Sequence, residues 1–518
     1  MNVKNKRLKK NIITSFLLQV ITLICGFILP GLILNVYGSI YNGIVNSVNQ
    51  FLSCITLLRA GVGGATRAAL YKSLANDDNN KTSEIINATE SFMRKIAILF
   101  VAFLLLFACG YPFLVKNSFD WFFSFSLVII LGLSTIAQYY FGITYQFLLQ
   151  ADQKQYIYNY LQIIAIIINT VFTIILINFG LDIRIVKLVS AFSFGMVPIA
   201  LYYYVKKNYK IDKKVKYTSD TLKGRWDAFA HQVASFIHSN TDIMVLTVMS
   251  DLYNVSIYSV YNLVVSGIKQ LICTCSNSIE AMIGESIAKK NYEKLRNDIK
   301  KYEWWINTLS LLFFGCTCSL IVSFVLIYTT GVNDADYNQP LFAYFLCFAT
   351  YLSCIRLPYQ SVVEAAGHFK QTKKGAIIEA FINVLISIFF VRKYGCIGVA
   401  LGTCAAMLYR TIDYGLYASK NILQRSNSYL YKRMIISILS FCLIILINYI
   451  FLGKVVNDIS NNYFKWFICG VIIFSIQLIL VLIIDIMFYY KETKDVISNI
   501  KKKVRIWKKG WTIWIYWE

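Results

Sequence analysis

The sequence has little charge, little histidine and little proline. Charged residues make up 15% of its 518 positions and hydrophobic residues 57%, whereas soluble domains have about 25% and about 45–50%. Three His and five Pro argue against a dense metal site and against a Pro-rich linker. The mean hydropathy of +0.56 indicates a chain that lies largely within a lipid bilayer. We therefore expect an all-α polytopic membrane protein.

The sequence also lacks the short motifs of several enzyme classes. It has no GxxxxGK[ST], which excludes ATP hydrolysis by a P-loop, and it has no GxSxG or HExxH. Its 13 Cys stand singly or as CxC, nearly all inside apolar runs, and show no zinc spacing. The triplet Asp334-Ala335-Asp336 resembles the acidic pair of lipid-sugar-dependent membrane glycosyltransferases, but such a triplet is common by chance. We expect no enzyme activity, no cofactor and no metal site.

Positive charge is the one kind of charge in excess. The net charge of +24 raises the question of a nucleic-acid partner. However, the Lys and Arg residues cluster in the gaps between apolar runs, as membrane topology predicts. We therefore expect no nucleic-acid partner.

Long apolar runs are abundant. A membrane-spanning helix needs about 20 apolar residues, and fourteen stretches qualify. The first of them is too long for the core of a signal peptide, which has about 7–15 residues. The predicted spans are 12–36, 43–70, 95–115, 121–147, 157–179, 183–205, 227–249, 254–284, 304–328, 340–362, 375–394, 396–419, 433–452 and 466–489.

The positions of the Lys and Arg residues support this count. If the N-terminus is cytoplasmic, nearly all 51 of them lie on the cytoplasmic side or within spans. The outer loops then hold only Lys116, Arg184, Arg392, Lys393, Lys454 and Lys465. By the positive-inside rule we expect a multi-pass protein with both termini in the cytoplasm.

The two halves of the chain are similar to each other. Tyr145-Gln146 and Asn169 match Tyr359-Gln360 and Asn383 at an offset of 214, and matches nearer the N-terminus have an offset of 212 or 213. Each half has six predicted spans, an even number, so both halves enter the membrane in the same orientation. We therefore predict two six-helix parallel repeats with a substrate site between them, followed by a C-terminal helix pair.

This symmetry predicts the domain organisation. The predicted parts are an N-terminal six-helix bundle (1–205), a basic cytoplasmic linker (206–226), a C-terminal six-helix bundle (227–420), two additional helices (421–490) and a basic, Trp-rich cytoplasmic tail (491–518). On a helix the four tail Trp would share one face, which is typical of a segment that lies in the membrane interface.

Two basic residues lie inside apolar helices at related positions. The stretch Asn42–Lys72 reads as one long helix with Arg59 in its middle. An arginine within a span costs at least about 2.5–3.5 kcal/mol, so it usually faces a cavity or a partner. Lys269 lies two residues from the position that the repeat pairs with Arg59. Facing each other across a cavity, the two cations would bind a phosphate or pyrophosphate; alternatively, each snorkels or pairs with a local acid.

Other charged residues fall in or near predicted spans. Asp242 is the deepest acid of its helix, and either binds a coupling Na⁺ or H⁺ or neutralises Lys269. Arg356 lies just before a proline, where a helix bends and exposes its backbone, which makes it a second candidate for a cavity wall. Arg410 and Asp413 are three positions apart on one helix, and we predict that they form a structural pair.

Several local sequences carry a resemblance to a known family. These are YGSIYNGIVNSVNQF (37–51), LLRAGVGGATRAAL (57–70) and NTDIMVLTVMSDLYNVSIYSVYN (240–262). With the span count and the repeat, they resemble the multidrug/oligosaccharidyl-lipid/polysaccharide exporter superfamily. Within it the chain looks like a Wzx-type polysaccharide or O-antigen flippase. The resemblance covers about residues 10–490 and implies a MATE/MurJ-like fold.

The resemblance also implies a function. Two six-helix bundles would use alternating access to carry an undecaprenyl-pyrophosphate-linked oligosaccharide to the outer leaflet of the bacterial cytoplasmic membrane. The product would serve surface polysaccharide assembly, as lipopolysaccharide or capsule. Arg59 and Lys269 would bind the pyrophosphate, although Lys269 stands where the family more usually has Arg. The implied partners are the lipid-linked oligosaccharide, membrane lipids, a polysaccharide polymerase and chain-length proteins.

Two other functions stay open at this point. A cation-coupled multidrug exporter of the same fold should present acids to cationic drugs, whereas the symmetric candidates here are cations. An O-unit polymerase or ligase typically has a large outer loop with catalytic residues, and the outer loops here are short. Coupling to a Na⁺ or H⁺ gradient is compatible with either transporter.

Overall fold

The computed structural model describes residues 3–115, 117–217, 229–288, 292–457 and 462–494. Some helix residues in this part are described by their backbone alone, Arg59 among them. The four Trp of the tail and residues 218–226 of the predicted linker lie outside the described residues. The proposed interfacial role of the tail therefore stays a prediction.

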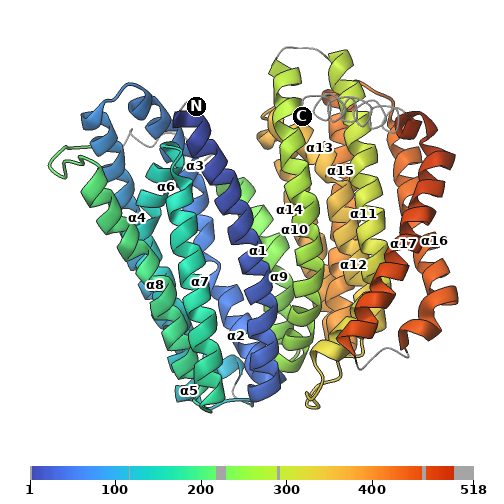
Figure 1. Ribbon diagram of the computed structural model, residues 1–518, viewed down its shortest axis with the longest axis horizontal. Coiled ribbons are helices and arrows are strands. Elements are labelled where there is room, and N and C mark those ends of the chain that lie inside the picture. The colour runs from blue at the N-terminus through green and yellow to red at the C-terminus, as the bar shows by residue number, and fades with distance from the viewer. Residues whose placement is uncertain (1–2, 116, 218–228, 289–291, 458–461, 495–518) are drawn as a thin grey trace, which may run out of the picture. The chain divides into compact units, whose positions relative to one another are not determined.

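Every regular element in these ranges is a helix (Figure 1). In chain order the elements are α1 (Val3–Tyr37), α2 (Ser39–Leu52), α3 (Ile55–Ala75), α4 (Asn79–Leu114), α5 (Trp121–Ala137), the π-helix η1 (Gln138–Gly142), α6 (Ile143–Ala151), α7 (Gln155–Asn178), α8 (Ile183–Asn208), α9 (Phe229–Met249), α10 (Leu252–Ala288), α11 (Tyr292–Tyr328), α12 (Pro340–Ile355), α13 (Leu357–Ala365), α14 (Phe369–Tyr394), α15 (Cys396–Asn421), α16 (Asn427–Asn457) and α17 (Tyr463–Phe488).

Twelve helical segments in the described part are long and apolar enough to cross a membrane. Two of them are interrupted: α5, η1 and α6 form one segment, and α12 and α13 form another. The prediction of an all-α, multi-pass membrane protein is confirmed. The predicted spans 43–70 and 227–249 fall on α2–α3 and α9, where several side chains are not described. The total of fourteen therefore stays a prediction.

The helices bury one face and expose the other, as α17 illustrates. Its buried residues Cys469, Ile473, Gln477, Val481 and Ile484 recur every three or four positions and so form one stripe. That stripe packs against α11 and α16. The opposite face is apolar and exposed, which suits contact with lipid, where helices satisfy their backbone hydrogen bonds internally.

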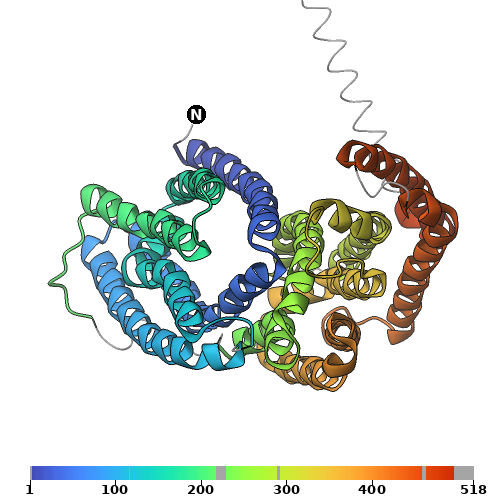
Figure 2. The ribbon, with the colours of Figure 1, turned by 90° about the horizontal axis from the view of Figure 1, so that it is seen from below.

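The chain divides into two compact units. The first comprises Met1–Val260, Gly331–Asp336 and Ile386–Val399, and the second comprises the remaining residues. In the first unit, α1 packs on α7, α7 on α8, α8 on α5, α5 on α4 and α4 on α3, which forms the ring of blue to green helices seen end-on in Figure 2. In the second unit, α11 packs on α12, α16 and α17. The helix α9 packs on α2 and α3 and so belongs to the first unit, whereas the repeat assigns it to the second bundle. The domain boundaries predicted from the repeat stay a prediction.

The helix predicted over Asn42–Lys72 is interrupted, which corrects the sequence reading. It ends as α2 at Leu52 and resumes as α3 at Ile55. At the break the Ser53 hydroxyl donates to the carbonyl of Gln50 at 2.6 Å. Such local side-chain hydrogen bonds compete with the helix ladder. The pattern of apolar residues does not register this effect, because it runs through the break unchanged.

Asp334, of the acidic triplet, caps α2. Its carboxylate accepts hydrogen bonds from the backbone N–H of Ser39 at 2.7 Å and from the Ser39 hydroxyl at 2.6 Å. Gly38 precedes the helix with φ +91°, and a Cβ there would lie 2.7 Å from Asp334 Oδ2. The position therefore needs glycine. Asp334 supplies the acceptor that an N-cap side chain normally provides.

Candidate functional site

The structure places the four predicted site residues on separate elements. Arg59 lies in α3, and its side chain is outside the described part. Asp242 lies in α9 and Lys269 in α10. Arg356 is the single residue between α12 and α13, two positions before Pro358. The pairing of Arg59 with Lys269 stays a prediction.

Lys269 and Arg356 lie in one neighbourhood of the second unit. The thiols of Cys273, one turn along α10 from Lys269, and of Cys354, beside Arg356, both lie within electrostatic range of the two cations. Lys269 is half-buried and forms no ion pair with any residue whose side chain the structure describes. The site therefore combines two cations from distant parts of the sequence.

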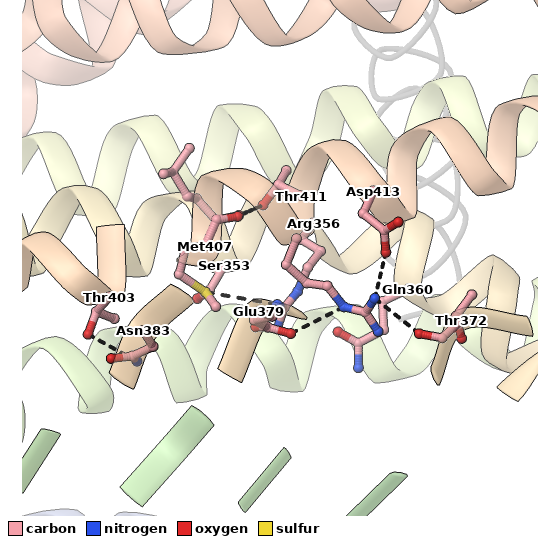
Figure 3. Close-up of polar contacts among 12 residues, drawn as sticks. Ser353, Arg356, Gln360, Thr372, Glu379, Asn383, Thr403, Met407, Thr411 and Asp413 are labelled. Atoms are coloured by element: carbon pink, nitrogen blue, oxygen red, sulfur yellow. Dashed lines mark hydrogen bonds and ion pairs between the residues drawn. The ribbon is translucent and has the colours of Figure 1, made fainter. Parts of the chain in front are cut away.

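Arg356 is held in place by an acid on α14. Its Nη1 donates to Glu379 Oε1 at 3.0 Å and lies 3.9 Å from the sulfur of Met407 (Figure 3). Its buried Nε has no hydrogen-bond partner. A donor left unsatisfied away from water costs about 1–3 kcal/mol. Arg356 thus has donor capacity that Glu379 does not use.

Glu379 also binds a second arginine, Arg410. Arg410 Nε lies 3.2 Å from Glu379 Oε2, and Arg410 Nη1 donates to Asp413 Oδ2 at 2.6 Å, so the predicted structural pair is confirmed. The same Nη1 donates to the carbonyl of Thr372 at 3.2 Å (Figure 3). Arg410 is only 1% exposed. The result is a chain of alternating charges, Arg356–Glu379–Arg410–Asp413, hereafter the ion-pair chain.

Lys269 has no ion-pair partner among the described side chains, whereas the ion-pair chain matches two cations with two acids. A further acid, Glu364, lies near Tyr414, as Arg356 and Arg410 do, and accepts a hydrogen bond from Gln360. In a low-dielectric interior an uncompensated charge is costly, and a bound anion would compensate it. The arrangement therefore suits an anion such as a phosphate, with the ion-pair chain fixing Arg356 and Lys269 supplying the unmatched charge.

Glu379 was assigned no role from the sequence. The two arginines that it binds lie 23 and 31 positions away, outside α14, so no helical spacing identifies them. One local signal was present. A Cβ at Gly375, one turn before Glu379, would lie 2.0 Å from Asp413 Oδ2 and 2.3 Å from Arg410 Nη1, so this glycine makes room for the arginine.

Asp242 lies in the first unit and is buried at 6% exposure. Its Oδ2 accepts a hydrogen bond from the Tyr258 hydroxyl at 2.7 Å. Among the residues with described side chains, no three metal-ligating side chains come together. His231 and His238, which share a helix face by spacing, have side chains outside the described part.

Comparisons with known proteins identify the fold. The structure is similar to the lipid II flippase MurJ in an inward closed conformation, with a TM-score of 0.68, 16% identity and coverage of 94% of this chain and 99% of that one. It is similar to an inward-facing multidrug resistance MATE family transporter of the MOP superfamily, with a TM-score of 0.61, 14% identity and coverage of 77% and 95%. A Vibrio cholerae MATE transporter, VcmN in the bent form, has a TM-score of 0.54, 14% identity and coverage of 82% and 100%.

The chain has the fold of these transporters. The predicted MATE/MurJ-like architecture is therefore confirmed, although identities of this size show the fold alone. No protein-family model matches the sequence, and no curated protein matches it significantly. The narrower Wzx-type assignment consequently belongs with the proposed function.

Proposed function

We propose that the chain is a flippase for undecaprenyl-pyrophosphate-linked oligosaccharide units. It would carry them from the cytoplasmic to the outer leaflet by alternating access, for surface polysaccharide assembly. The observation that carries the proposal is the cationic site of the second unit. Lys269 has no acidic partner among the side chains described, and Arg356 retains an unused donor. A pyrophosphate offers the negative charge and the acceptors that both cations lack.

The fold supports the proposal independently. The similarity to a lipid II flippase extends over 94% of this chain. Arg59, whose counterpart under the repeat lies two residues from Lys269, is proposed as a further cation for the pyrophosphate. Membrane lipids, a polysaccharide polymerase and chain-length proteins are the partners that this function would require, in the bacterial cytoplasmic membrane.

The test uses a strain that lacks the gene and carries variants on a plasmid. We expect Lys269→Gln and Arg356→Gln each to reduce surface polysaccharide and to accumulate lipid-linked sugar in the inner leaflet. The expected loss of transport is about 10- to 100-fold, because a hydrogen bond to a charged group contributes roughly 1.5–3 kcal/mol. The measurement is lipid-linked sugar accessible from outside spheroplasts.

Lys269→Arg is the matched control, since it keeps the charge and should retain most of the transport. All variants are checked for equal amounts in the membrane. Normal surface polysaccharide in the strain without the gene would refute the proposed function. Normal transport by the Lys269→Gln, Arg356→Gln double variant would refute the proposed site.

A second candidate function is a cation-coupled multidrug exporter. The similarity to MATE transporters and the buried acid Asp242 favour it. In either transporter we propose Asp242 as the residue that couples transport to a Na⁺ or H⁺ gradient. The exporter predicts that deleting the gene sensitises cells to cationic drugs while surface polysaccharide stays normal, which is the reverse of the flippase result.

A further inference from the structure

A cavity of about 220 Å³ lies in the first unit, whereas Lys269 and Arg356 belong to the second unit. Four elements line it: α5, η1 with α6, α7 and α8. Its polar lining is Ser134, Gln138, Gln146, Tyr158 and Gln162, and Phe194 contributes an aromatic ring. None of the lining side chains is an acid, a lysine, an arginine or a histidine. The cavity therefore offers hydrogen bonds without charge.

The cavity faces the inside of the helix bundle. On α7, Tyr158 and Gln162 line it, whereas Tyr160 and Ile164 are 46% and 52% exposed on the other side of the helix. On α8, Phe194 lines it, and the neighbouring Phe192 and Met196 are exposed on the opposite face. At 100° per residue these sets point in opposite directions. The polar groups are thus kept off the apolar outer surface of the unit.

The backbone around the cavity is irregular on two sides. The π-helix η1 interrupts the α5–α6 segment at Gln138–Gly142, and such turns are frequent at functional sites. A Cβ at Gly142 would lie 2.5 Å from Pro198 Cβ, so glycine is needed for this close approach. Pro198 has no N–H to donate to the carbonyl of Phe194, so α8 lacks one of its helical hydrogen bonds beside the cavity.

One buried side chain in the lining has an oxygen without a hydrogen-bond partner. Gln146 is 6% exposed, and its Oε1 is buried without a hydrogen-bond partner. Buried polar atoms in native proteins are nearly always satisfied, so an unsatisfied one in a cavity wall indicates a missing ligand or water. A hydroxyl group entering the cavity would donate to this oxygen.

The size and chemistry of the cavity limit the ligand. At roughly 30 Å³ per water molecule the space holds about seven waters, which is the scale of one sugar ring. Drug-sized ligands usually occupy about 300–1,000 Å³. The amides and hydroxyls of the lining can form hydrogen bonds with the hydroxyl groups of a sugar. The aromatic ring can pack against the apolar face of the sugar ring.

The repeat provides a contrast. At the offset of 214, Gly142 corresponds to Arg356 and Gln146 to Gln360. The second unit thus has a charged side chain of the ion-pair chain at a position where the first unit has glycine and a neutral cavity. The two halves have diverged in charge at matched positions, as they would if they bind chemically different parts of a ligand.

We propose that this cavity binds one neutral sugar residue, through Gln146, Gln138 and Ser134. The sugar belongs to the glycan of a lipid-linked substrate, an assignment that rests on the proposed function; a free monosaccharide has the same chemistry. The inference assigns the neutral part of the substrate to the first unit.

The first experiment measures binding to the full chain in lipid nanodiscs by saturation-transfer-difference NMR. The probes are the methyl glycosides of glucose, galactose and N-acetylglucosamine. We expect a signal from at least one probe and about tenfold weaker binding by Gln146→Leu, as the loss of hydrogen bonds implies. Gln477→Leu is the matched control, because Gln477 is also buried with an unpartnered Oε1 but lies on α17 of the second unit. Gln138→Leu replaces Gln146→Leu if the latter elutes as aggregate in size-exclusion chromatography.

The second experiment measures transport in proteoliposomes of undecaprenyl pyrophosphate with and without an attached oligosaccharide. We expect Gln146→Leu to slow only the glycosylated lipid. If Gln146→Leu slows only the glycosylated lipid, the cavity binds a sugar of the lipid-linked substrate. If the chain transports neither lipid but binds a glycoside, and Gln146→Leu abolishes that binding, the cavity binds a free sugar. In that second case the flippase proposal fails and the inference stands. The inference is wrong if no probe gives a signal that depends on Gln146 and Gln146→Leu transports both lipids as the unaltered chain does. The cavity would then hold only water. This result is independent of whether transport depends on Lys269.

Discussion

Glu379 determines whether two arginines can stay inside the second unit. Its two carboxylate oxygens contact different partners, Arg356 and Arg410. Removing one partner of a buried ion pair is strongly destabilising, since the remaining charge is left uncompensated, whereas the intact pair contributes little net stability. The ion-pair chain is therefore better understood as a means of positioning Arg356 than as a source of stability.

We predict that Glu379→Gln lowers the free energy of unfolding by about 3–5 kcal/mol, because two buried cations lose their shared counter-charge. The measurement is unfolding in detergent, followed by thiol reactivity of the buried cysteines. Glu364→Gln is the control: Glu364 accepts a hydrogen bond from Gln360 at 2.7 Å but has no described ion pair, so its loss should cost about 1 kcal/mol. Equal stability of the two variants would contradict the ion-pair chain.

The sequence identified the charged residues of this site but not their connections. Lys269 and Arg356 stand out because a cation in an apolar run is rare. The Arg410–Asp413 pair could be predicted because both lie on one helix. The contacts of Glu379 depend on how α14 packs beside two other helices, and a single sequence contains no spacing rule for that.

Two helix interruptions differ in how far the sequence predicts them. The interruption at Arg356 follows from the proline two residues later. The break between α2 and α3 involves no proline and no glycine. It comes with the hydrogen bond of Ser53 to Gln50 and a contact of the same hydroxyl with Asn240 Oδ1 at 3.0 Å. The second contact is with a residue far along the chain, and local sequence does not predict it.

The start of α2 depends on a residue almost 300 positions away, Asp334. We predict that Asp334→Ala weakens the first turn of α2 by about 1 kcal/mol, the usual cost of losing an N-cap acceptor. Amide hydrogen exchange of a peptide covering 38–43 should accelerate about fivefold. Asp120→Ala is the matched control, because Asp120 occupies the N-cap position of α5 without a side-chain cap hydrogen bond. Unchanged exchange in Asp334→Ala would show that the cap is not formed in solution.

At the scale of the whole molecule, the repeat read from the sequence coincides with the helix irregularities. The π-helix at Gln138–Gly142 and the interruption at Arg356 coincide under the offset of 214, which relates Gly142 to Arg356. Long apolar runs predicted the spans and the fold class, since lipid imposes simple rules on both. It could not predict the substrate, which depends on side chains lining small spaces.

The predicted membrane orientation of α8 can be tested with reporter fusions. Gly180 and Lys210 flank α8, whose 26 residues extend about 39 Å at 1.5 Å per residue, enough to cross a bilayer. Alkaline phosphatase folds to an active enzyme only outside the cytoplasm. We predict an active fusion after Gly180, on the outer side, and an inactive fusion after Lys210, on the cytoplasmic side. A fluorescent-protein fusion should show the reverse pattern.

A fusion after Asp152, between α6 and α7, is the control and should behave as the Lys210 fusion does. Active phosphatase at both Asp152 and Lys210 would invert the orientation. Activity at only one of these two positions would mean that α7 and α8 do not both cross the membrane.

The ion-pair chain has a consequence for how the protein is made. Its members Arg356, Glu379, Arg410 and Asp413 leave the ribosome in that order, with alternating sign, at roughly 5–20 residues per second. Each charge after the first thus reaches the bilayer when an opposite charge is already present to neutralise it. Gly395, the single residue joining α14 to α15, keeps the interval between Glu379 and Arg410 short. Charges that would each hinder insertion alone can therefore enter in succession as neutral pairs.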